Sequence, residues 1–247
     1  GIHLHIGSPI YSADPYVRAI TKALVLIDDL RGKGFEIDTL DIGGGYGGSA
    51  RYIAQHHNAD VVSLNLSEVQ NERARRKNAE RGLDQRVSIV DGDFENIPFD
   101  EGHFDIVWSQ DAMLHSGNRE RVLDEVARVL KAGGTFIFTD PMQADDCPKG
   151  MLQPILDRIH LESLGSPGFY RRETARLGPS EVVFEAMTHQ LTTHYSRVLQ
   201  ETERHEKELN DQISSDYLAR MRKGLGHWVE GGHRGHLVWG IFHFHKD

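Results

Sequence analysis

Hydrophobic residues in this chain form two kinds of pattern, short apolar runs and segments in which apolar residues recur every three or four positions. The runs are typical of buried strands, and the recurrence is typical of helices that cover a sheet. The two kinds alternate up to about residue 139, which favours a mostly parallel α/β sheet. The predicted strands are 37–42, 61–66, 87–90, 104–109 and 135–139, and the predicted helices are 17–30, 49–57, 67–81 and 122–130.

Capping signals support two of these helices. Asp14-Pro15 suits an N-cap followed by the first helical position. Ser67 is followed three residues later by Gln70, which is the spacing of a capping box. The alternation of strand and helix therefore has support from helix starts as well as from periodicity.

The pattern changes after Asp140. Residues 153–164 favour a helix, 182–187 a strand, about 192–223 a long polar helix, and 237–242 a last strand. We therefore expect one domain over residues 1–247, with a doubly wound, Rossmann-like sheet of seven mostly parallel strands. A lid-like helical insertion at about 190–235 would precede the last strand.

Composition and charge narrow the class of protein. The chain is 38% hydrophobic and 26% charged, which is typical of globular proteins, and it has no apolar run of about 18 residues for a membrane span. Its net charge of -9 repels phosphate backbones, so we expect no nucleic-acid partner. Cys147 is the single cysteine, and no basic-then-apolar segment begins the chain, so we expect a cytoplasmic protein. The sequence predicts no particular oligomeric state.

A glycine-rich turn, DIGGGYGG, follows the first strand. Only glycines let the backbone turn there and approach a ligand without side-chain obstruction. Gly43, Gly45 and Gly48 fit the dinucleotide pattern, whereas the alternation of Asp41, Gly43, Gly45 and Gly47 fits the turn of S-adenosylmethionine enzymes. The turn alone leaves a nicotinamide cofactor, S-adenosylmethionine and an unliganded turn open.

Residues after the second and third strands favour S-adenosylmethionine. Asp93 and Phe94 follow the third strand, where methyltransferases place an Asp on the adenine amino group and a backbone amide on the ring. A surface turn is the alternative for Asp93. The second strand ends in Asn65, where an acid normally accepts from the ribose hydroxyls; an amide can still accept and donate.

A more specific likeness lies in segments spread over most of the chain. They are NLSEVQN at 65–71, WSQDAMLHS at 108–116, TDPMQ at 139–143, QPILDRIH at 153–160, HYS at 194–196 and GLGHW at 224–228. In them the chain resembles the sarcosine and dimethylglycine N-methyltransferases, which complete glycine betaine synthesis. A broader likeness, through Asp140 and Tyr195, links it to phosphoethanolamine methyltransferases. The resemblance implies S-adenosylmethionine as cofactor, bound by Asp41, Gly43, Gly45, Asn65, Gln70, Asp93, Phe94 and Gln110.

Methyl transfer to an amine imposes a proton problem. The reaction needs a neutral lone pair about 3 Å from the methyl carbon and opposite the sulfur. Sarcosine and dimethylglycine are ammonium ions at neutral pH, so the site must bind the minor neutral form or accept the proton. His115, Asp140 and Tyr195 are the predicted catalytic residues. A helix-capping role is the alternative for His115.

We also expect an apolar surface around the methylated nitrogen of the acceptor and a cationic side chain at its carboxylate. A quaternary ammonium cannot donate hydrogen bonds and favours aromatic faces and soft atoms, so Pro141-Met142 favours a methylated amine over glycine. Core filling is the alternative for Met142. Arg158 or Arg197 would bind the carboxylate, with Arg197 preferred beside His194, although both could be solvated. The predicted substrate-binding residues are His5, Pro141, Met142, Arg158, Tyr170, His194, Arg197 and Trp228.

Two other function classes are open to test. A nicotinamide oxidoreductase would use the same glycine turn, and a non-catalytic cofactor-binding subunit would keep the fold. The 15 histidines lack the spacing of a metal site, so we predict no metal. The charged run at 202–210 is predicted to be a solvated helix face.

Overall fold

The computed structural model describes residues 38–42, 45–57, 59–211 and 213–247. The helix predicted over 17–30 lies outside these residues. So do His5 and Gly43 of the predicted site.

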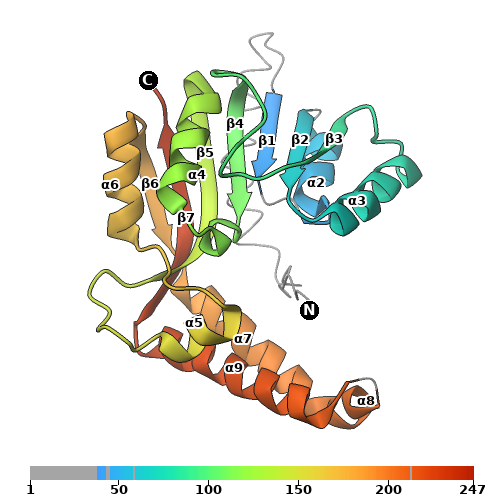
Figure 1. The fold of residues 1–247 in the computed structure, drawn as a ribbon, viewed down its shortest axis with the longest axis vertical. Coiled ribbons are helices and arrows are strands. Elements are labelled where there is room, and N and C mark those ends of the chain that lie inside the picture. Colours follow the sequence, from blue (N-terminus) through green and yellow to red (C-terminus); the bar gives the residue numbers. More distant parts are fainter. Residues whose placement is uncertain (1–37, 43–44, 58, 212) are drawn as a thin grey trace.

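A seven-stranded sheet organises the described residues (Figure 1). Its strand order is β3-β2-β1-β4-β5-β7-β6; β7 pairs antiparallel with both β5 and β6, and the other described pairings are parallel. The strands are β1 (Asp38–Ile42), β2 (Asp60–Asn65), β3 (Val87–Asp91), β4 (Phe104–Gln110), β5 (Leu130–Gln143), β6 (Ser180–Ala186) and β7 (Leu237–His245). The predicted mostly parallel, Rossmann-like sheet is confirmed.

Helices cover both faces of the sheet. On one face, α4 (Arg119–Val129) presents an apolar stripe at helical spacing that packs on the aromatic side chains of β5 and β7, next to α6 (Pro167–Leu177). On the other face, α2 (Gly48–His57) buries Ile53 and its alanines in the core that includes Val61 of β2 and Val87 of β3. Helix α3 (Glu68–Glu80) lies along β2 and β3. These layers build two cores, one on each face.

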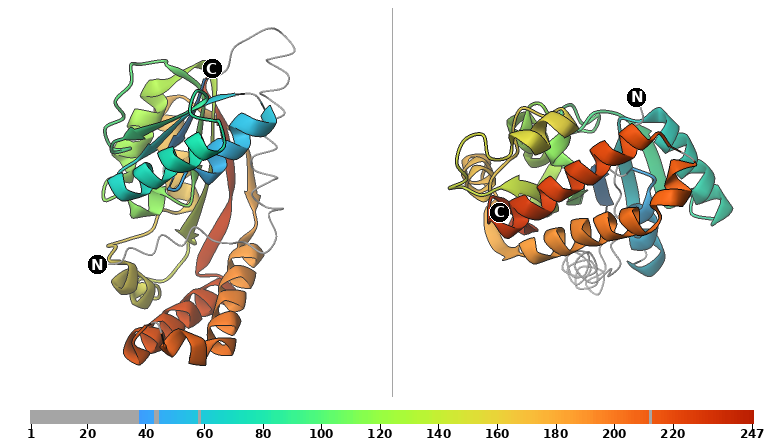
Figure 2. Two further views of the ribbon diagram at one scale, coloured as in Figure 1. Left: turned by 90° about the vertical axis from the view of Figure 1, so that its right-hand side faces the viewer. Right: turned by 90° about the horizontal axis from the view of Figure 1, so that it is seen from below.

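A third group of helices lies beyond the carboxyl ends of the parallel strands. Figure 1 shows α5 (Gln153–Ile159), α7 (Thr188–Arg204), α8 (Glu206–Asn210) and α9 (Ser215–His233) on the side to which the arrows of β1 and β4 point. Seen from below in Figure 2, α7 and α9 run across the end of the sheet. No helix in the described ranges is both long and apolar enough to cross a membrane.

The structure differs from the sequence-based expectation in two helical segments, one predicted wrongly and one not predicted. The single polar helix predicted over 192–223 is three helices, because the chain turns back after α8 and Ser214 starts α9 by accepting a hydrogen bond from the amide of Tyr217 at 3.3 Å. Helix α6 was not predicted, although Ser166 and Pro167 carry a start signal. The Ser166 hydroxyl accepts from the amide of Phe169 at 3.1 Å.

We predict that Gly240→Ala destabilises the sheet. Gly240 lies in β7 between β5 and β6, and an added Cβ would lie 2.3 Å from the carbonyl oxygen of Glu185. The strands must separate, so the free energy of unfolding should fall by about 1–3 kcal/mol. Urea unfolding followed by circular dichroism measures this.

Gly226→Ala is the matched control. Gly226 lies in α9, and an added Cβ there meets no heavy atom within 4 Å. The free energy of unfolding should stay unchanged or rise by up to about 1 kcal/mol. Equal losses in the two variants would contradict the close approach at Gly240.

Candidate functional site

The predicted site residues gather at one edge of the sheet. Asp41, Asn65 and Gln110 stand at the carboxyl ends of β1, β2 and β4. The strand order reverses between β1 and β4, and open α/β sheets bind ligands at such a switch point. The Ser49 hydroxyl donates to Gln110 Oε1 at 2.8 Å and ties the start of α2 to this point.

Asp41 is the most unusual group at this edge. It is buried, and its Oδ2 accepts no hydrogen bond from the described residues. Burial raises the pKa of Asp41 to about 7. A buried, unpaired carboxylate is costly unless a cation or donor joins it. Asp41 Oδ2 is therefore a buried acceptor that the described residues leave without a donor.

Glycines shape the turn that follows β1. Gly45 and Gly47 have positive φ angles of 47° and 71°, a region in which glycine is favoured. A Cβ on Gly47 would lie 2.9 Å from Arg51 Nη1. The backbone conformation therefore favours glycine at both positions, and a side chain at Gly47 would also displace the end of the Arg51 side chain.

The ends of β2 and β3 hold the other predicted cofactor contacts. Asn65 Nδ2 donates to Gln70 Oε1 at 3.1 Å, so these two predicted residues do lie together. Asp93 is exposed, and its Oδ1 accepts from the amide of Glu95 at 2.9 Å. Phe94 is half-buried against the core. The Asp93 carboxylate thus stabilises its own turn while standing at the same edge.

Asp140 lies behind the edge. It has no exposed surface, and its Oδ2 accepts from the Tyr170 hydroxyl at 2.6 Å while Oδ1 accepts from the amide of Leu114 at 3.1 Å. Burial raises the pKa of Asp140 to about 7, against the lowering effect of the Tyr170 hydrogen bond. Burial also raises the pKa of Tyr170 well above its usual value. Asp140 thus joins β5 to α6 and to η1 (Met113–His115).

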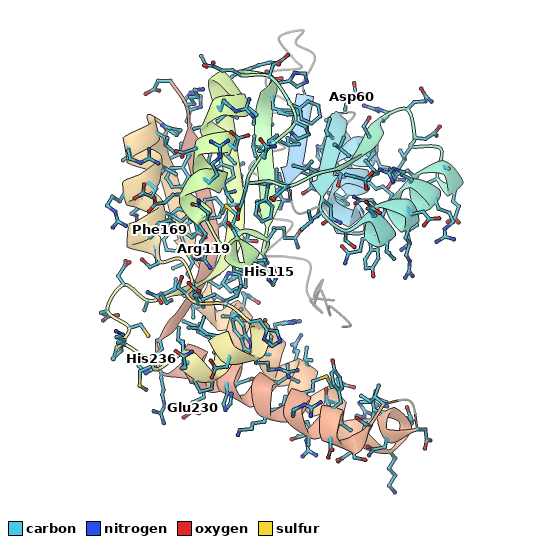
Figure 3. The ribbon with its side chains drawn as sticks, viewed as in Figure 1. Asp60, His115, Arg119, Phe169, Glu230 and His236 are labelled. Atoms are coloured by element: carbon cyan, nitrogen blue, oxygen red, sulfur yellow. The ribbon has the colours of Figure 1, made fainter. Side chains whose placement is uncertain are left out.

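His115 ends η1 and is exposed. Figure 3 shows it between the sheet and the helices α5 and α9. The amide of Leu114, one residue earlier, is held by Asp140. The position of His115 therefore depends on a buried carboxylate.

The pair Pro141-Met142 does not form one surface. Side chains alternate along β5, so Met142 shares the face of Asp140, within the buried core that contains Tyr170. Pro141 pairs with Trp239 of β7, whose side chain belongs to the opposite core. Met142 and Tyr170 are both fully buried. This arrangement fits the core-filling alternative for Met142 and gives no support to a shared apolar wall.

The helices beyond the sheet bring three predicted residues together. Tyr195 of α7 stacks on Trp228 of α9, with ring centroids 4.8 Å apart and planes at 16°. His194 is buried, and neither of its ring nitrogens has a hydrogen-bond partner among the described residues. Burial lowers the pKa of His194, which favours the neutral ring. Helices α7 and α9 therefore carry an aromatic pair beside a buried imidazole.

The two candidate arginines differ in their surroundings. Arg197 is exposed on α7. Arg158 is half-buried and lies on Gly224 of α9, where an added Cβ would be 2.2 Å from its Cδ. Neither makes an ion pair within the described part of the chain. Burial favours Arg158, contrary to the preference that the sequence suggested.

Sequence reasoning missed Asp111. It follows β4 with a positive φ of 48°, which is uncommon for a residue with a side chain and is often found at functional sites. Its Oδ1 accepts from Thr139 Oγ1 at 2.9 Å and from Trp239 Nε1 at 2.8 Å. Burial is the main reason that the pKa values of Asp140 and Tyr195 are raised, and the nearby charge of Asp111 raises both further. The sequence signal that could have indicated Asp111 is its place as an acidic residue directly after a predicted central strand, where open α/β sheets bind ligands.

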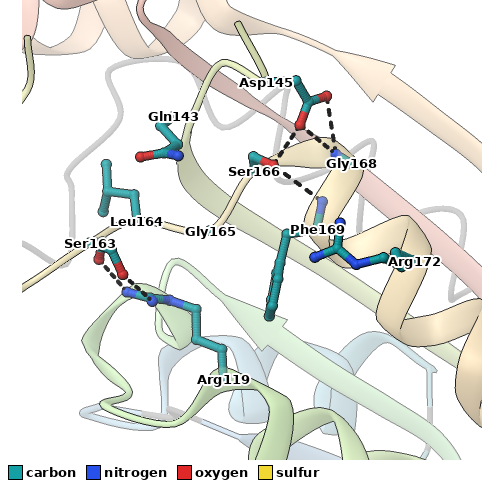
Figure 4. A pocket seen from close by; sticks show the side chains of 10 residues that line it. All are labelled: Arg119, Gln143, Asp145, Ser163, Leu164, Gly165, Ser166, Gly168, Phe169 and Arg172. Carbon is teal, nitrogen blue, oxygen red and sulfur yellow. Dashed lines mark hydrogen bonds between the residues drawn. The ribbon is translucent and has the colours of Figure 1, made fainter. Parts of the chain in front are cut away.

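A cavity of about 400 Å³ lies next to this region (Figure 4). Arg119 on its wall donates from Nη2 to the carbonyl oxygen of Leu114 at 2.9 Å and from Nη1 to Ser163 Oγ at 3.2 Å. The lining residues are Arg119, Gln143, Asp145, Ser163, Leu164, Gly165, Ser166, Gly168, Phe169 and Arg172. None of them belongs to the predicted site. The cavity adjoins η1 through Arg119, which holds the carbonyl oxygen of Leu114.

The described ranges contain no candidate metal-binding cluster. No three His, Cys, Asp or Glu side chains lie there in an arrangement that could hold an ion.

Known proteins resemble this chain in sequence and in fold. A family model described as a methyltransferase domain matches residues 40–138. A sarcosine/dimethylglycine N-methyltransferase from Halorhodospira halochloris is 52% identical over all of this chain and 88% of its own. A structure from Galdieria sulphuraria, provisionally assigned as a sarcosine dimethylglycine methyltransferase, is 36% identical, with a TM-score of 0.83 over 92% of this chain and 86% of its own.

A more distant structure shares the fold. Haemonchus contortus phosphoethanolamine N-methyltransferase 2, solved with phosphomonomethylethanolamine and S-adenosylhomocysteine, is 20% identical, with a TM-score of 0.75 over 85% of this chain and 49% of its own. The family resemblance inferred from the sequence segments is confirmed by the whole-chain match. With 52% identity over its whole length, the chain belongs to the sarcosine/dimethylglycine N-methyltransferase family.

Proposed function

We propose that this chain methylates the amine nitrogen of sarcosine, dimethylglycine or both, the last step giving glycine betaine. The observation that carries the proposal is a carboxylate beside aromatic rings: Asp111, directly after β4, accepts from Trp239 Nε1 at 2.8 Å, and Trp239 shares a core cluster with the stacked rings of Tyr195 and Trp228. A carboxylate and aromatic faces together suit a methylated ammonium ion. The Halorhodospira relative, with 52% identity, is named for the same two acceptors.

S-adenosylmethionine would supply an electrophilic methyl group at this edge. The residues fit it: Asp41 offers an unpaired, buried carboxylate oxygen to its cationic amino group. The glycine turn lets backbone approach, and Asn65 offers an amide oxygen to the ribose. Asp93 and the Phe94 amide would meet the adenine, with Gln70 and Gln110 alongside.

The catalytic residues divide into a proton acceptor and its supports. His115, exposed at the end of η1, would receive the ammonium proton. Asp140 and Tyr170 would position it by holding the amide of Leu114. Tyr195 has a raised pKa, so it stays protonated at neutral pH and would act as a hydrogen-bond donor and an aromatic wall. Asp111 would stabilise the positive charge that develops on the acceptor nitrogen as the methyl group is transferred.

The lid would bind the other end of the acceptor. Arg158 lies between α5 and α9 and would bind the carboxylate through its planar guanidinium. His194, buried beside Tyr195, would offer a neutral donor. Helices α7, α8 and α9 would then form the lid over a single methyltransferase domain. A cytoplasmic location would suit Cys147, which is not in a disulfide.

We predict methylation of sarcosine and dimethylglycine, with little of glycine or phosphoethanolamine. The aromatic pair favours N-methyl groups over the bare ammonium of glycine. Mass spectrometry of reactions with S-adenosylmethionine and each acceptor measures this. Turnover of phosphoethanolamine alone would contradict the proposal, and binding of NADH without S-adenosylhomocysteine would point to an oxidoreductase.

We predict that cofactor affinity depends on the ionisation of Asp41. The pKa of Asp41 is raised to about 7, so affinity for S-adenosylhomocysteine should rise between about pH 6 and pH 8 as the carboxylate loses its proton. Asp41→Asn should abolish that rise and weaken binding at the higher pH by roughly 1–3 kcal/mol. Isothermal titration calorimetry measures both.

The same ionisation has the opposite effect on the ligand-free protein. A raised pKa means that folded protein holds a proton that unfolded protein loses, so the free energy of unfolding should fall as pH rises from about 4 to 7. Asp60→Asn, at the exposed amino end of β2, is the control and should keep both pH dependences. An unchanged pH dependence in Asp41→Asn would contradict the assignment.

We predict that Arg158, and not Arg197, binds the acceptor carboxylate. Arg158→Gln should raise the KM for dimethylglycine by roughly tenfold or more, the loss of a charged hydrogen bond, with affinity for S-adenosylhomocysteine unchanged. Arg197→Gln should leave both unchanged because Arg197 is exposed on α7. Steady-state kinetics measures the KM, and calorimetry measures the affinity for S-adenosylhomocysteine. A raised KM in Arg197→Gln with an unchanged KM in Arg158→Gln would place the acceptor carboxylate at Arg197.

A further inference from the structure

An interlocked set of amides lies where β2 and β3 end beside α3 (Figure 1). Asn65, the last residue of β2, donates from Nδ2 to Asn71 Oδ1 and to Gln70 Oε1, each at 3.1 Å. Both hydrogens of that amide nitrogen are engaged by these contacts. The Asn65 Oδ1 is therefore the part of the side chain left to accept a hydrogen bond from a ligand.

The orientation of Asn71 follows from its own partners. Its Nδ2 donates to the backbone oxygen of Asn65 and to Asp91 Oδ1, each at 2.7 Å. A backbone carbonyl and an ionised carboxylate can only accept. Hydrogen bonds from Asn71 and Arg75 lower the pKa of Asp91, so it is ionised at neutral pH. Asn71 must therefore turn its Nδ2 toward these two oxygens and its Oδ1 toward the Asn65 side chain.

Burial prevents Asn71 from turning away. Asn71 is 1% exposed. Its backbone N–H donates to the backbone oxygen of Ser67 at 2.9 Å within the first turn of α3. A carboxylate at position 65 would face the Asn71 oxygen with no proton between them. Two such oxygens about 3 Å apart repel unless one is protonated.

We propose that Asn71 is a positioning residue that excludes an acid from position 65 and presents the ribose with one neutral amide oxygen. The inference rests on the proposed function for the identity of the ligand. It explains why the position where an acid is normal carries Asn65. The charge of Asp91 is not a substitute for that acid, because Arg75 and Asn71 hold both of its oxygens.

A double-mutant cycle tests the proposal with S-adenosylhomocysteine as the probe. Calorimetry compares the wild type, Asn65→Asp, Asn71→Ala and the double variant at about pH 8. Asn65→Asp should weaken binding roughly tenfold or more in the wild type, but by less than about threefold in the Asn71→Ala background. Equal effects in the two backgrounds, or tighter binding by Asn65→Asp in the wild type, would overturn the proposal.

A second measurement needs no ligand. The carboxylate of Asn65→Asp should keep its proton against the Asn71 oxygen, so its free energy of unfolding relative to the wild type should fall as pH rises from about 4 to 7. That fall should shrink in the Asn71→Ala background. Asp91 and Arg75, the charged groups of the network, are present in every variant. If the wild type fails to bind S-adenosylhomocysteine, the proposed function fails, while this measurement still decides the role of Asn71.

Asn78 supplies the matched control. It is also 1% exposed on α3, donating to the backbone oxygen of Val87 at 3.0 Å and accepting from Arg51 at 3.1 Å. Asn78→Ala should lower the melting temperature but leave the penalty of Asn65→Asp intact. Relief of that penalty by Asn78→Ala would mean that any loosening of α3 suffices, and would overturn the specific role. Asn71→Ser replaces Asn71→Ala if the latter does not fold.

Discussion

The buried carboxylate of Asp140 connects the parts that the site requires. One oxygen holds the Tyr170 hydroxyl from α6, and the other holds the amide of Leu114 in η1. Because the group is fully buried, losing either donor would leave an unsatisfied polar atom in the core. The position of η1, and of His115 at its end, therefore depends on packing on the α4 and α6 face of the sheet. Arg119 adds a second hold through the carbonyl oxygen of Leu114.

Two buried carboxylates near the sheet edge differ in their hydrogen-bond partners. Asp41 and Asp140 are both buried with pKa values raised to about 7, but they differ in partners. Asp140 has two protein donors, whereas Asp41 Oδ2 has none among the described residues. A group satisfied by the fold supports structure, and a group left short of a partner favours a cationic ligand. Burial alone does not separate these roles.

The helices beyond the sheet supply a different environment. The stacked rings of Tyr195 and Trp228 give a face that attracts a cation without requiring it to donate hydrogen bonds. Arg158 lies against Gly224 because a glycine leaves space there for an arginine side chain between α5 and α9. Acid, aromatic and arginine side chains thus come from separate elements, and the fold of α7 and α9 brings them over the strand ends.

The sequence by itself determined the order of elements, the mostly parallel sheet and the family. Local periodicity, the glycine turn and segments such as WSQDAMLHS depend only on neighbours along the chain. It also singled out Asp140, Tyr195 and Trp228 as candidate site residues. It could not show that Asp140 lies behind the site, that Met142 belongs to the core, or that Arg158 is more buried than Arg197. Those properties depend on which strand face a side chain takes and which distant helix packs on it. Asp111 shows the limit most clearly, since its strained backbone and its hydrogen bond from Trp239 exist only once β4, β5 and β7 have paired.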